Sequence, residues 1–165
     1  MQHTNPDETL SALCPPVNLP LGRLPEVRPA GDGWEIRDPL RRRWLVLTPE
    51  EWVRQTFTIY LADTLGVPAT MTANEVGIHL NGTLKRCDTV IYDRRLKPLA
   101  IVEYKAPHVA ITRQVFEQIL RYNIVLGVKY VIVSNGMRTL CASVSPEGKC
   151  RLLGAIPDYD KMCGV

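Results

Sequence analysis

Hydrophobic residues recur at helical or strand spacing along most of the chain from residue 48 onward. Apolar residues that return every three or four positions predict a helix, whereas alternating or short continuous apolar runs predict strands. The elements predicted in this way are a helix at 48–65, a hairpin at 75–80 and 83–92, a strand at 99–105, a helix at 112–126, and strands at 130–134 and 139–144. This order predicts an α/β domain built on one mixed sheet.

The first predicted helix has a strong start signal in Thr48-Pro-Glu-Glu51. Thr48 can cap the helix, Pro49 suits the first helical position, and Glu51 completes a capping box. We expect the helix to end at Gly66-Val-Pro68, because glycine and proline both stop helices.

The predicted hairpin turns at Asn81-Gly82, the preferred pair for a two-residue type I′ turn. Such a turn places Leu80 opposite Thr83, and counting back along both strands places Glu75 opposite Asp88. Opposed residues share a face of the sheet, so we expect these two acids to lie close together. A register slip of one residue would separate them.

Residues 1–33 differ from the rest of the chain because they are rich in proline and turn signals. Proline fixes φ and removes a backbone donor, so we expect an extended arm on the surface. The composition changes at Trp34, and a short β-ribbon is predicted around Asp38-Pro39. We expect a single domain over 34–165, with its core at 48–145 and a short packed element in the tail.

The composition is typical of a globular protein, since 45% of the 165 residues are hydrophobic and 22% are charged. The formal net charge of +3 permits a polyanionic partner but does not require one. The five cysteines lack Cys-x-x-Cys spacing, which predicts free thiols in the reducing cytoplasm. No apolar run approaches the ~18 residues that a membrane-spanning helix needs. We therefore expect a cytoplasmic protein without a membrane partner.

Three charged residues lie beside apolar strand segments: Asp88, Glu103 and Lys105. Glu103 and Lys105 follow the apolar run 99–102, and side chains two apart on a strand share a face. Unpaired charge is costly to bury, so these side chains need a partner or a function. Taken alone, the Glu-x-Lys triplet favours a simple salt bridge at a strand end. Asp88 on the preceding strand favours a shared site instead.

Carboxylates that converge on one point repel each other unless a cation neutralises them. Oxygen ligands with open positions suit Mg²⁺, with Mn²⁺ as an alternative, and such ions commonly bind one or two carboxylates plus a substrate phosphate. A lysine beside the ion can position the attacking water and oppose the charge that grows on phosphorus. The three residues therefore predict metal-assisted hydrolysis of a phosphodiester.

These residues resemble the PD-(D/E)xK nuclease superfamily, in the branch that carries a helical Gln-x-x-x-Tyr motif. More narrowly, residues 34–145 resemble the N-terminal nuclease domain of type I restriction enzyme R subunits. The motifs that carry the resemblance are Thr48-Pro-Glu-Glu-Trp-Val-Arg-Gln55, Arg86-x-Asp88, Val102-Glu-Tyr-Lys-Ala-Pro107, Gln118-x-x-x-Tyr-Asn123 and Ser134-Asn-Gly136. The resemblance implies a restriction-endonuclease-like core, with a central mixed β-sheet flanked by helices.

The resemblance also implies roles for the matching residues. Asp88 and Glu103 would bind the metal, and the backbone carbonyl of Tyr104 would add a ligand. Lys105 would be the catalytic lysine.

An acidic residue on the first helix commonly completes sites of this kind. Here either Glu51 or Glu50 can serve, and we favour Glu51 slightly, although it is equally suited to its capping role. Glu75 is a further candidate acid from the hairpin register alone.

The remaining candidate residues would contact the substrate or support the lysine. Gln118 and Tyr122 are four apart and so share one helix face, where Tyr122 alternatively serves as a core aromatic residue. Basic residues that can contact a phosphate backbone are Arg86, on the same strand face as Asp88, and the triplet Arg41, Arg42 and Arg43.

The chain departs from its relatives in one respect. Type I R subunits continue into an ATP-driven translocase, whereas these 165 residues contain no Gly-x-x-x-x-Gly-Lys-Ser/Thr phosphate loop. We therefore expect a stand-alone, Mg²⁺-dependent DNA nuclease, an endonuclease rather than an exonuclease, which acts alone or with a separate motor or specificity subunit. The alternatives are a catalytically silent nucleic-acid-binding or assembly module of the same fold, and a protein whose three charges are structural. The oligomeric state is not predicted.

Overall fold

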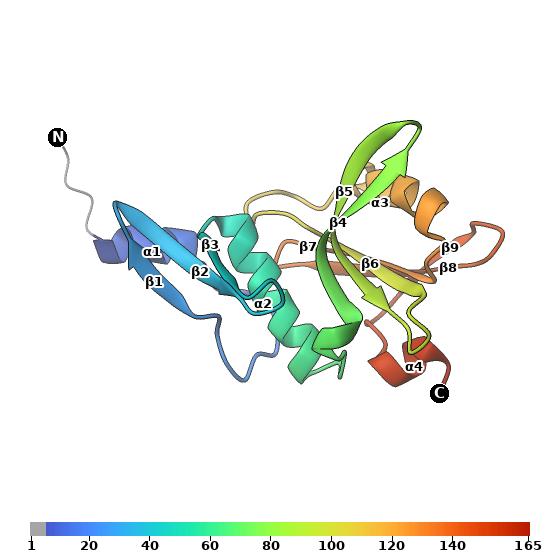
Figure 1. Cartoon of the computed structure of the whole chain (residues 1–165), viewed down its shortest axis with the longest axis horizontal. Coiled ribbons are helices and arrows are strands. Elements are labelled where there is room, and N and C mark those ends of the chain that lie inside the picture. Colours follow the sequence, from blue (N-terminus) through green and yellow to red (C-terminus); the bar gives the residue numbers. More distant parts are fainter. Residues whose placement is uncertain (1–5) are drawn as a thin grey trace.

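A six-stranded mixed sheet forms the centre of the computed structural model, which describes residues 6–165 (Figure 1). Its strands follow the order β4 (Thr72–Leu80), β5 (Thr83–Tyr92), β6 (Pro98–Tyr104), β7 (Tyr130–Ser134), β8 (Thr139–Val144) and β9 (Cys150–Leu153). The β6–β7 pair is parallel and the other neighbouring pairs are antiparallel. The parallel pair needs a crossover, which a helix supplies. The predicted α/β fold with a mixed sheet is confirmed.

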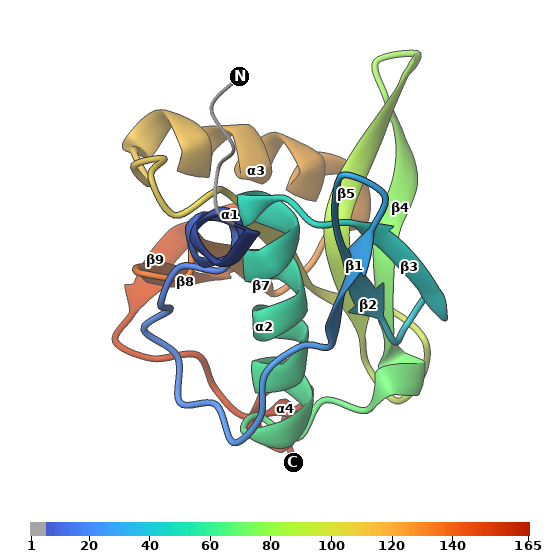
Figure 2. The same cartoon turned by 90° about the vertical axis from the view of Figure 1, so that its left-hand side faces the viewer.

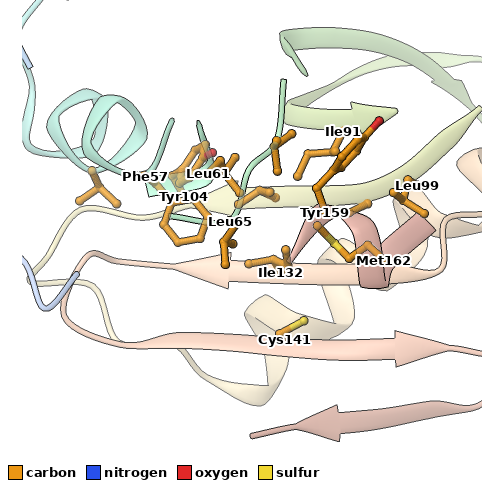
Figure 3. Packing of buried hydrophobic residues seen from close by; sticks show 14 residues of the cluster. Phe57, Leu61, Leu65, Ile91, Leu99, Tyr104, Ile132, Cys141, Tyr159 and Met162 are labelled. Carbon is orange, nitrogen blue, oxygen red and sulfur yellow. The ribbon is translucent and has the colours of Figure 1, made fainter. Parts of the chain in front are cut away.

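Helices cover both faces of this sheet because its central strands are apolar on both sides. The helices of the described residues are α1 (Pro6–Leu13), which packs against α2 and the second sheet rather than on this one, α2 (Pro49–Asp63), α3 (Arg113–Leu126) and α4 (Tyr159–Cys163), with a 3-10 turn at Ala69–Met71. α2 and α4 pack on the face that carries Val102 and Ile132, where Phe57 is fully buried (Figure 3). α3 packs on the opposite face against Ile101 and Val131. Adjacent strand residues thus alternate between the two cores.

Helix α2 begins where the sequence predicts. The Thr48 side chain accepts a hydrogen bond from the backbone N–H of Glu51 at 3.1 Å, and Pro49 occupies the first turn. The chain reverses after the helix at Gly66, whose φ of +69° suits a residue without a side chain. The cap and the stop signal therefore set both ends of α2.

The β4–β5 hairpin has the predicted register. The turn residues Asn81-Gly82 both adopt positive φ, as a type I′ turn requires, and Leu80 pairs with Thr83. The ladder keeps this register on both sides of position 75, so Glu75 lies opposite Asp88.

The outer half of this hairpin extends beyond the main sheet (Figures 1 and 2). The ladder pairs between β5 and β6 run from Thr89 to Tyr92, so the preceding residues of β5 continue past the end of β6. One face of the extension packs on α3 through Ile78. Alternation places Leu84 and Arg86 on the other face, where both are exposed.

A second, three-stranded antiparallel sheet precedes α2 and consists of β1 (Val27–Ala30), β2 (Gly33–Asp38) and β3 (Arg43–Val46). The β2–β3 pair is the predicted ribbon. The expectation of an extended arm over 1–33 needs correction at α1 and β1, while residues 1–5 lie outside the described residues. Prolines did not prevent β1 from pairing, because Pro29 lies on an edge strand.

Helix α2 lies between the two sheets (Figure 1). Its Trp52 packs with Ile36 and Leu47 in a small core that also contacts Leu10. The indole N–H of Trp52 donates to the carbonyl of Pro15 at 2.9 Å. The N-terminal segment is therefore packed on the helix that carries the candidate acids.

The C-terminal tail forms β9 and α4, which agrees with the predicted packed element. The Tyr159 hydroxyl donates to the carbonyl of Tyr92 at 3.0 Å, and its backbone N–H donates to Leu65 at 2.8 Å. The tail is thus tied to the main sheet and to the end of α2.

All five cysteines are free thiols. Burial raises the pKa of Cys87 to about 12 and that of Cys141 to about 11, so both stay protonated at neutral pH. Within residues 6–165, none of the helices is both long enough and apolar enough to cross a bilayer.

Candidate active site

Asp88 lies on β5 beside the point where the hairpin leaves the main sheet, and two donors hold its carboxylate. Arg54 Nη2 lies 2.9 Å from Oδ1, and the backbone N–H of Tyr104 lies 2.8 Å from Oδ2. The backbone N–H is available because Tyr104 lies two residues beyond Val102, the last partner of β5 on β6. Each carboxylate oxygen has a second lone pair, so Asp88 can still bind a cation.

Glu103 and Lys105 lie together where β6 ends. Lys105 Nζ donates to Glu103 Oε1 at 3.0 Å, and only 8% of Glu103 is exposed. The same-face spacing predicted this pair, which is the salt bridge that a bare Glu-x-Lys triplet favours. The structure adds Asp88 within electrostatic range of both residues.

The electrostatics of this group are those of crowded acids. Burial, and then the charge of Asp88, raise the pKa of Glu103 to about 7, against the opposing effect of Lys105. Burial lowers the pKa of Lys105, but its hydrogen bond to Glu103 and the surrounding carboxylates leave it above the usual value. Lys105 is therefore a cation at neutral pH, and Glu103 is poised to gain or lose a proton.

The two acids in the first turn of α2 have different surroundings. Glu51 accepts hydrogen bonds from Arg54 Nη1 at 2.7 Å, Gln55 Nε2 at 2.8 Å and Arg41 Nη2 at 3.2 Å. Burial and the charge of Asp88 raise the pKa of Glu50, whereas Lys105 lowers it. Glu50 thus lies within electrostatic range of Asp88 and Lys105, while Glu51 is bound by two arginines and an amide.

Arg54 is the functional residue that sequence reasoning missed. Its side chain is 7% exposed and joins Glu51 to Asp88, with its guanidinium carbon 5.7 Å from the centre of the Tyr104 ring. The signal available in the sequence was the i, i+3 spacing of Glu51 and Arg54 on a capped helix. That spacing predicts the local pair but not the contact with β5.

Glu75 has left-handed backbone conformation, with φ of +55°. Residues other than glycine rarely adopt this backbone conformation, so contacts with neighbouring residues must stabilise it at Glu75. The Glu75 carboxylate meets Arg41 Nη1 at 2.7 Å and Arg54 Nη1 at 3.6 Å. The predicted register therefore places Glu75 opposite Asp88, but Arg54 lies between the two carboxylates.

The arginine triplet divides into one internal and two exposed members. Arg41 is 15% exposed and is bound by Asp38 as well as by Glu51 and Glu75. Arg42 is exposed, and 56% of the Arg43 side chain is accessible. Arg41 therefore joins the second sheet to α2, whereas its two neighbours keep surfaces open to a ligand.

Of the two candidate residues on α3, Gln118 is the one whose side chain the structure describes. Gln118 is solvent-exposed, and no polar contact from it to Asp88, Glu103 or Lys105 is recorded among the described residues. The side chain of Tyr122 lies outside the described residues.

Asp88 and Glu103 are the two candidate carboxylate ligands for a divalent cation at this site. Among the described residues, no three His, Cys, Asp or Glu side chains lie close enough to share one ion, so the third acid expected from the sequence does not join them. Burial, and then the charge of Asp88, nevertheless raise the pKa of Glu103. Mg²⁺ commonly takes one or two carboxylates together with substrate phosphates and waters, and this donor set suits it.

We expect Glu103 to make the metal-free protein less stable as the pH rises. Its pKa is raised from 4.5 to about 7, so between these values the folded protein holds more protons than the unfolded chain. The free energy of unfolding therefore falls as the pH rises from 4.5 through 7. Urea unfolding in chelator across this range should show a steeper decline for the wild type than for Glu103→Gln. Equal slopes would contradict the burial of an ionisable Glu103.

Comparison with known proteins supports the resemblance found in the sequence. Residues 49–157 match the family model described as type I restriction enzyme R protein N terminus. A solved structure, a fragment assigned as an HsdR subunit of a type I restriction enzyme from Vibrio vulnificus YJ016, is similar with a TM-score of 0.53 and 20% identity. The similarity covers 68% of this chain and 24% of that chain. No curated protein matches this chain.

Proposed function

Because the chain belongs to the family of type I restriction enzyme R protein N-termini, we propose that it is a metal-dependent nuclease domain that hydrolyses phosphodiester bonds of DNA. The observation that carries this proposal is the grouping of Asp88, Glu103 and Lys105 at the junction of β5 and β6. A structural salt bridge alone would explain Glu103 and Lys105. It would leave unexplained why a second acid, Asp88, raises the pKa of the buried one.

In this proposal Asp88 and Glu103 would hold Mg²⁺ or Mn²⁺, and the backbone carbonyl of Tyr104 would add a ligand. The ion supplies positive charge that polarises the phosphoryl group and favours attack by water. Arg54 and the Tyr104 N–H fix the orientation of Asp88 before substrate arrives. Such preorganisation avoids the cost of moving the ligand during the reaction.

Lys105 would act as a charged donor rather than as a base. Its neighbouring carboxylates raise its pKa, so it keeps its proton and can donate to the phosphoryl oxygens as their charge grows. Of the two acids in the first turn of α2, Glu50 is the one that stays available beside the Asp88 and Glu103 pair, as a neighbouring charge rather than a third ligand, because three donors already occupy the Glu51 carboxylate. Gln118 and Tyr122 would support the lysine or contact the substrate backbone.

The substrate and surroundings follow from the same proposal. We propose endonucleolytic cleavage of DNA in the cytoplasm, either by this domain alone or with a separate motor or specificity subunit. Exposed arginines beside Asp88 support a polyanionic substrate.

A silent binding module of the same fold is the second candidate. Arg54 already neutralises Asp88 and Lys105 already pairs with Glu103, so the acids are partly balanced by the chain itself. This candidate predicts salt-sensitive DNA binding without cleavage in any divalent ion.

The two candidates differ in one assay. The purified chain should convert supercoiled plasmid to nicked or linear DNA in Mg²⁺, and a chelator should stop the reaction because Asp88 and Glu103 lose their ion. An exonuclease would digest linear DNA and leave closed circles intact. DNA binding without cleavage in Mg²⁺ and in Mn²⁺ would establish the silent module instead.

A further inference from the structure

Arg43 and Arg86 come from different sheets and converge on one oxygen of Glu75. Arg43 Nη2 lies 3.8 Å and Arg86 Nη1 lies 3.6 Å from Glu75 Oε2. The first belongs to β3 and the second to β5, so no local sequence spacing brings them together. Two exposed cations thus flank a single acceptor beside the candidate active site.

Within residues 6–165, neither arginine donates a hydrogen bond from its guanidinium group. Their distances to Glu75 exceed hydrogen-bond length, and among the described residues no hydrogen bond is recorded from either guanidinium. Their side chains are 56% and 67% exposed. The carboxylate itself is already bound by Arg41 at 2.7 Å, so Glu75 attracts the two outer arginines without consuming their donors.

The position of Arg86 on β5 places the arginine pair near Asp88 of the candidate active site. Arg86 precedes Asp88 by two residues on β5, so both side chains leave the same face, roughly 7 Å apart along the strand. Gly77 opposes Arg86 across the hairpin and adds no side chain to that face. The Leu84 side chain lies 3.3 Å from the position that a Cβ of Gly77 would occupy. Along this face the exposed fraction rises from 16% at the Asp88 side chain to 67% at the Arg86 side chain.

The chemistry of the pair suits a phosphate. Guanidinium groups bind carboxylate and phosphate through the same forked N–H geometry, and a phosphodiester offers two charged oxygens to two arginines. We propose that Arg43 and Arg86 form a clamp for a backbone phosphate next to the phosphodiester held at Asp88 and Glu103, and that Glu75 keeps the clamp assembled when nucleic acid is absent. This inference rests on the proposed function. It assigns Glu75 to the clamp rather than to the metal, and Arg43 lies outside the matched residues 49–157.

The test measures binding of a short fluorescent DNA duplex by anisotropy, in chelator, at several salt concentrations. Each phosphate neutralised contributes about 0.9 to the slope of log affinity against log salt. Because the two arginines share one phosphate, Arg43→Ala with Arg86→Ala should lower the slope by about 0.9 in total, not by twice that. Arg94→Ala is the matched control, since Arg94 is 57% exposed and pairs with Asp160 far from the acids. Its slope should equal that of the wild type.

Glu75→Gln provides the second arm. It keeps the shape of the side chain but removes the negative charge with which a phosphate competes for the two arginines, so duplex binding should tighten several-fold, and the gain should vanish when both arginines are alanine. Weaker binding by a folded Glu75→Gln protein, or equal slopes for the double variant and Arg94→Ala, would overturn the clamp. Displacement of the duplex by millimolar inorganic phosphate, beyond that by chloride of equal ionic strength, would assign the clamp to free phosphate and overturn its role in nucleic-acid binding.

Failure of the clamp and failure of the nuclease proposal give different results. If the wild type cleaves plasmid while the double variant binds and cuts as Arg94→Ala does, the clamp is wrong and the nuclease stands. If the double variant loses binding but the folded wild type cuts nothing, the clamp stands as a nucleic-acid contact and the nuclease is wrong.

Discussion

Replacing Lys105 with alanine is expected to lower the rate of Mg²⁺-dependent DNA cleavage by about 10³-fold, or about 4 kcal/mol of transition-state stabilisation. Lys105 is a cation beside both candidate metal ligands, so its loss removes the charge that opposes the developing phosphoryl charge. Initial rates of plasmid nicking measure the effect. Lys161→Ala is a matched control, because Lys161 also pairs with a nearby carboxylate, Asp158 at 2.7 Å, but lies on α4.

The Mg²⁺ dependence separates catalysis from metal binding. Lys105 lowers the pKa of Glu103, so removing it also favours a protonated, weaker ligand. Saturating Mg²⁺ should restore binding, and the rate of Lys105→Ala should still stay low. A variant that recovers the wild-type rate at high Mg²⁺ would assign Lys105 to the metal site alone. Cleavage equal to that of Lys161→Ala at every Mg²⁺ concentration would remove Lys105 from the mechanism.

Replacing Arg54 with alanine is expected to lower the free energy of unfolding by about 3–5 kcal/mol, the cost of removing one partner from a buried ion pair. Arg54 is 7% exposed and bridges Glu51 at 2.7 Å to Asp88 at 2.9 Å. Among the described residues, the backbone N–H of Tyr104 would then be the remaining hydrogen-bond donor to the Asp88 carboxylate. Urea unfolding in chelator measures the change.

An exposed ion pair provides the comparison for Arg54. Arg94→Ala breaks a pair that is more than half exposed on both sides, for which about 0–1 kcal/mol is expected. A loss for Arg54→Ala no larger than that for Arg94→Ala would show that the buried network adds nothing to stability. Mg²⁺ should recover part of the lost stability in Arg54→Ala, since a bound cation can replace the missing charge at Asp88.

The elements that local signals specify could be predicted from the sequence. Thr48 supplies a side-chain cap within three residues of its partner, and Asn81-Gly82 determines its own turn type. Once the turn is known, the period of two places Asp88 and Arg86 on one face. The same period places Glu103 beside Lys105, as their 3.0 Å hydrogen bond bears out.

Contacts between distant segments could not be predicted in this way. The Pro-rich composition of residues 1–33 hides β1, because strand pairing with β2 depends on a partner rather than on composition. Arg41 and Arg43 look equivalent in sequence, yet the turn between β2 and β3 directs one inward and the other outward. Glu50 and Glu51 are neighbours on α2, so their side chains point about 100° apart around the helix axis. No spacing rule in the sequence tells which residues lie in each of these two directions.

The assignment of Asp88 as a metal ligand of a nuclease can be tested by comparing the cleavage of supercoiled plasmid by the wild type and by Asp88→Asn, side by side in Mg²⁺. Asparagine keeps the size of Asp88 but removes the charge that would hold the ion, and circular dichroism can verify that the variant is folded. We expect nicking by the wild type that a chelator abolishes, and none above background by Asp88→Asn. Equal nicking by both proteins, or no nicking by folded wild type in Mg²⁺ and in Mn²⁺, would contradict the assignment.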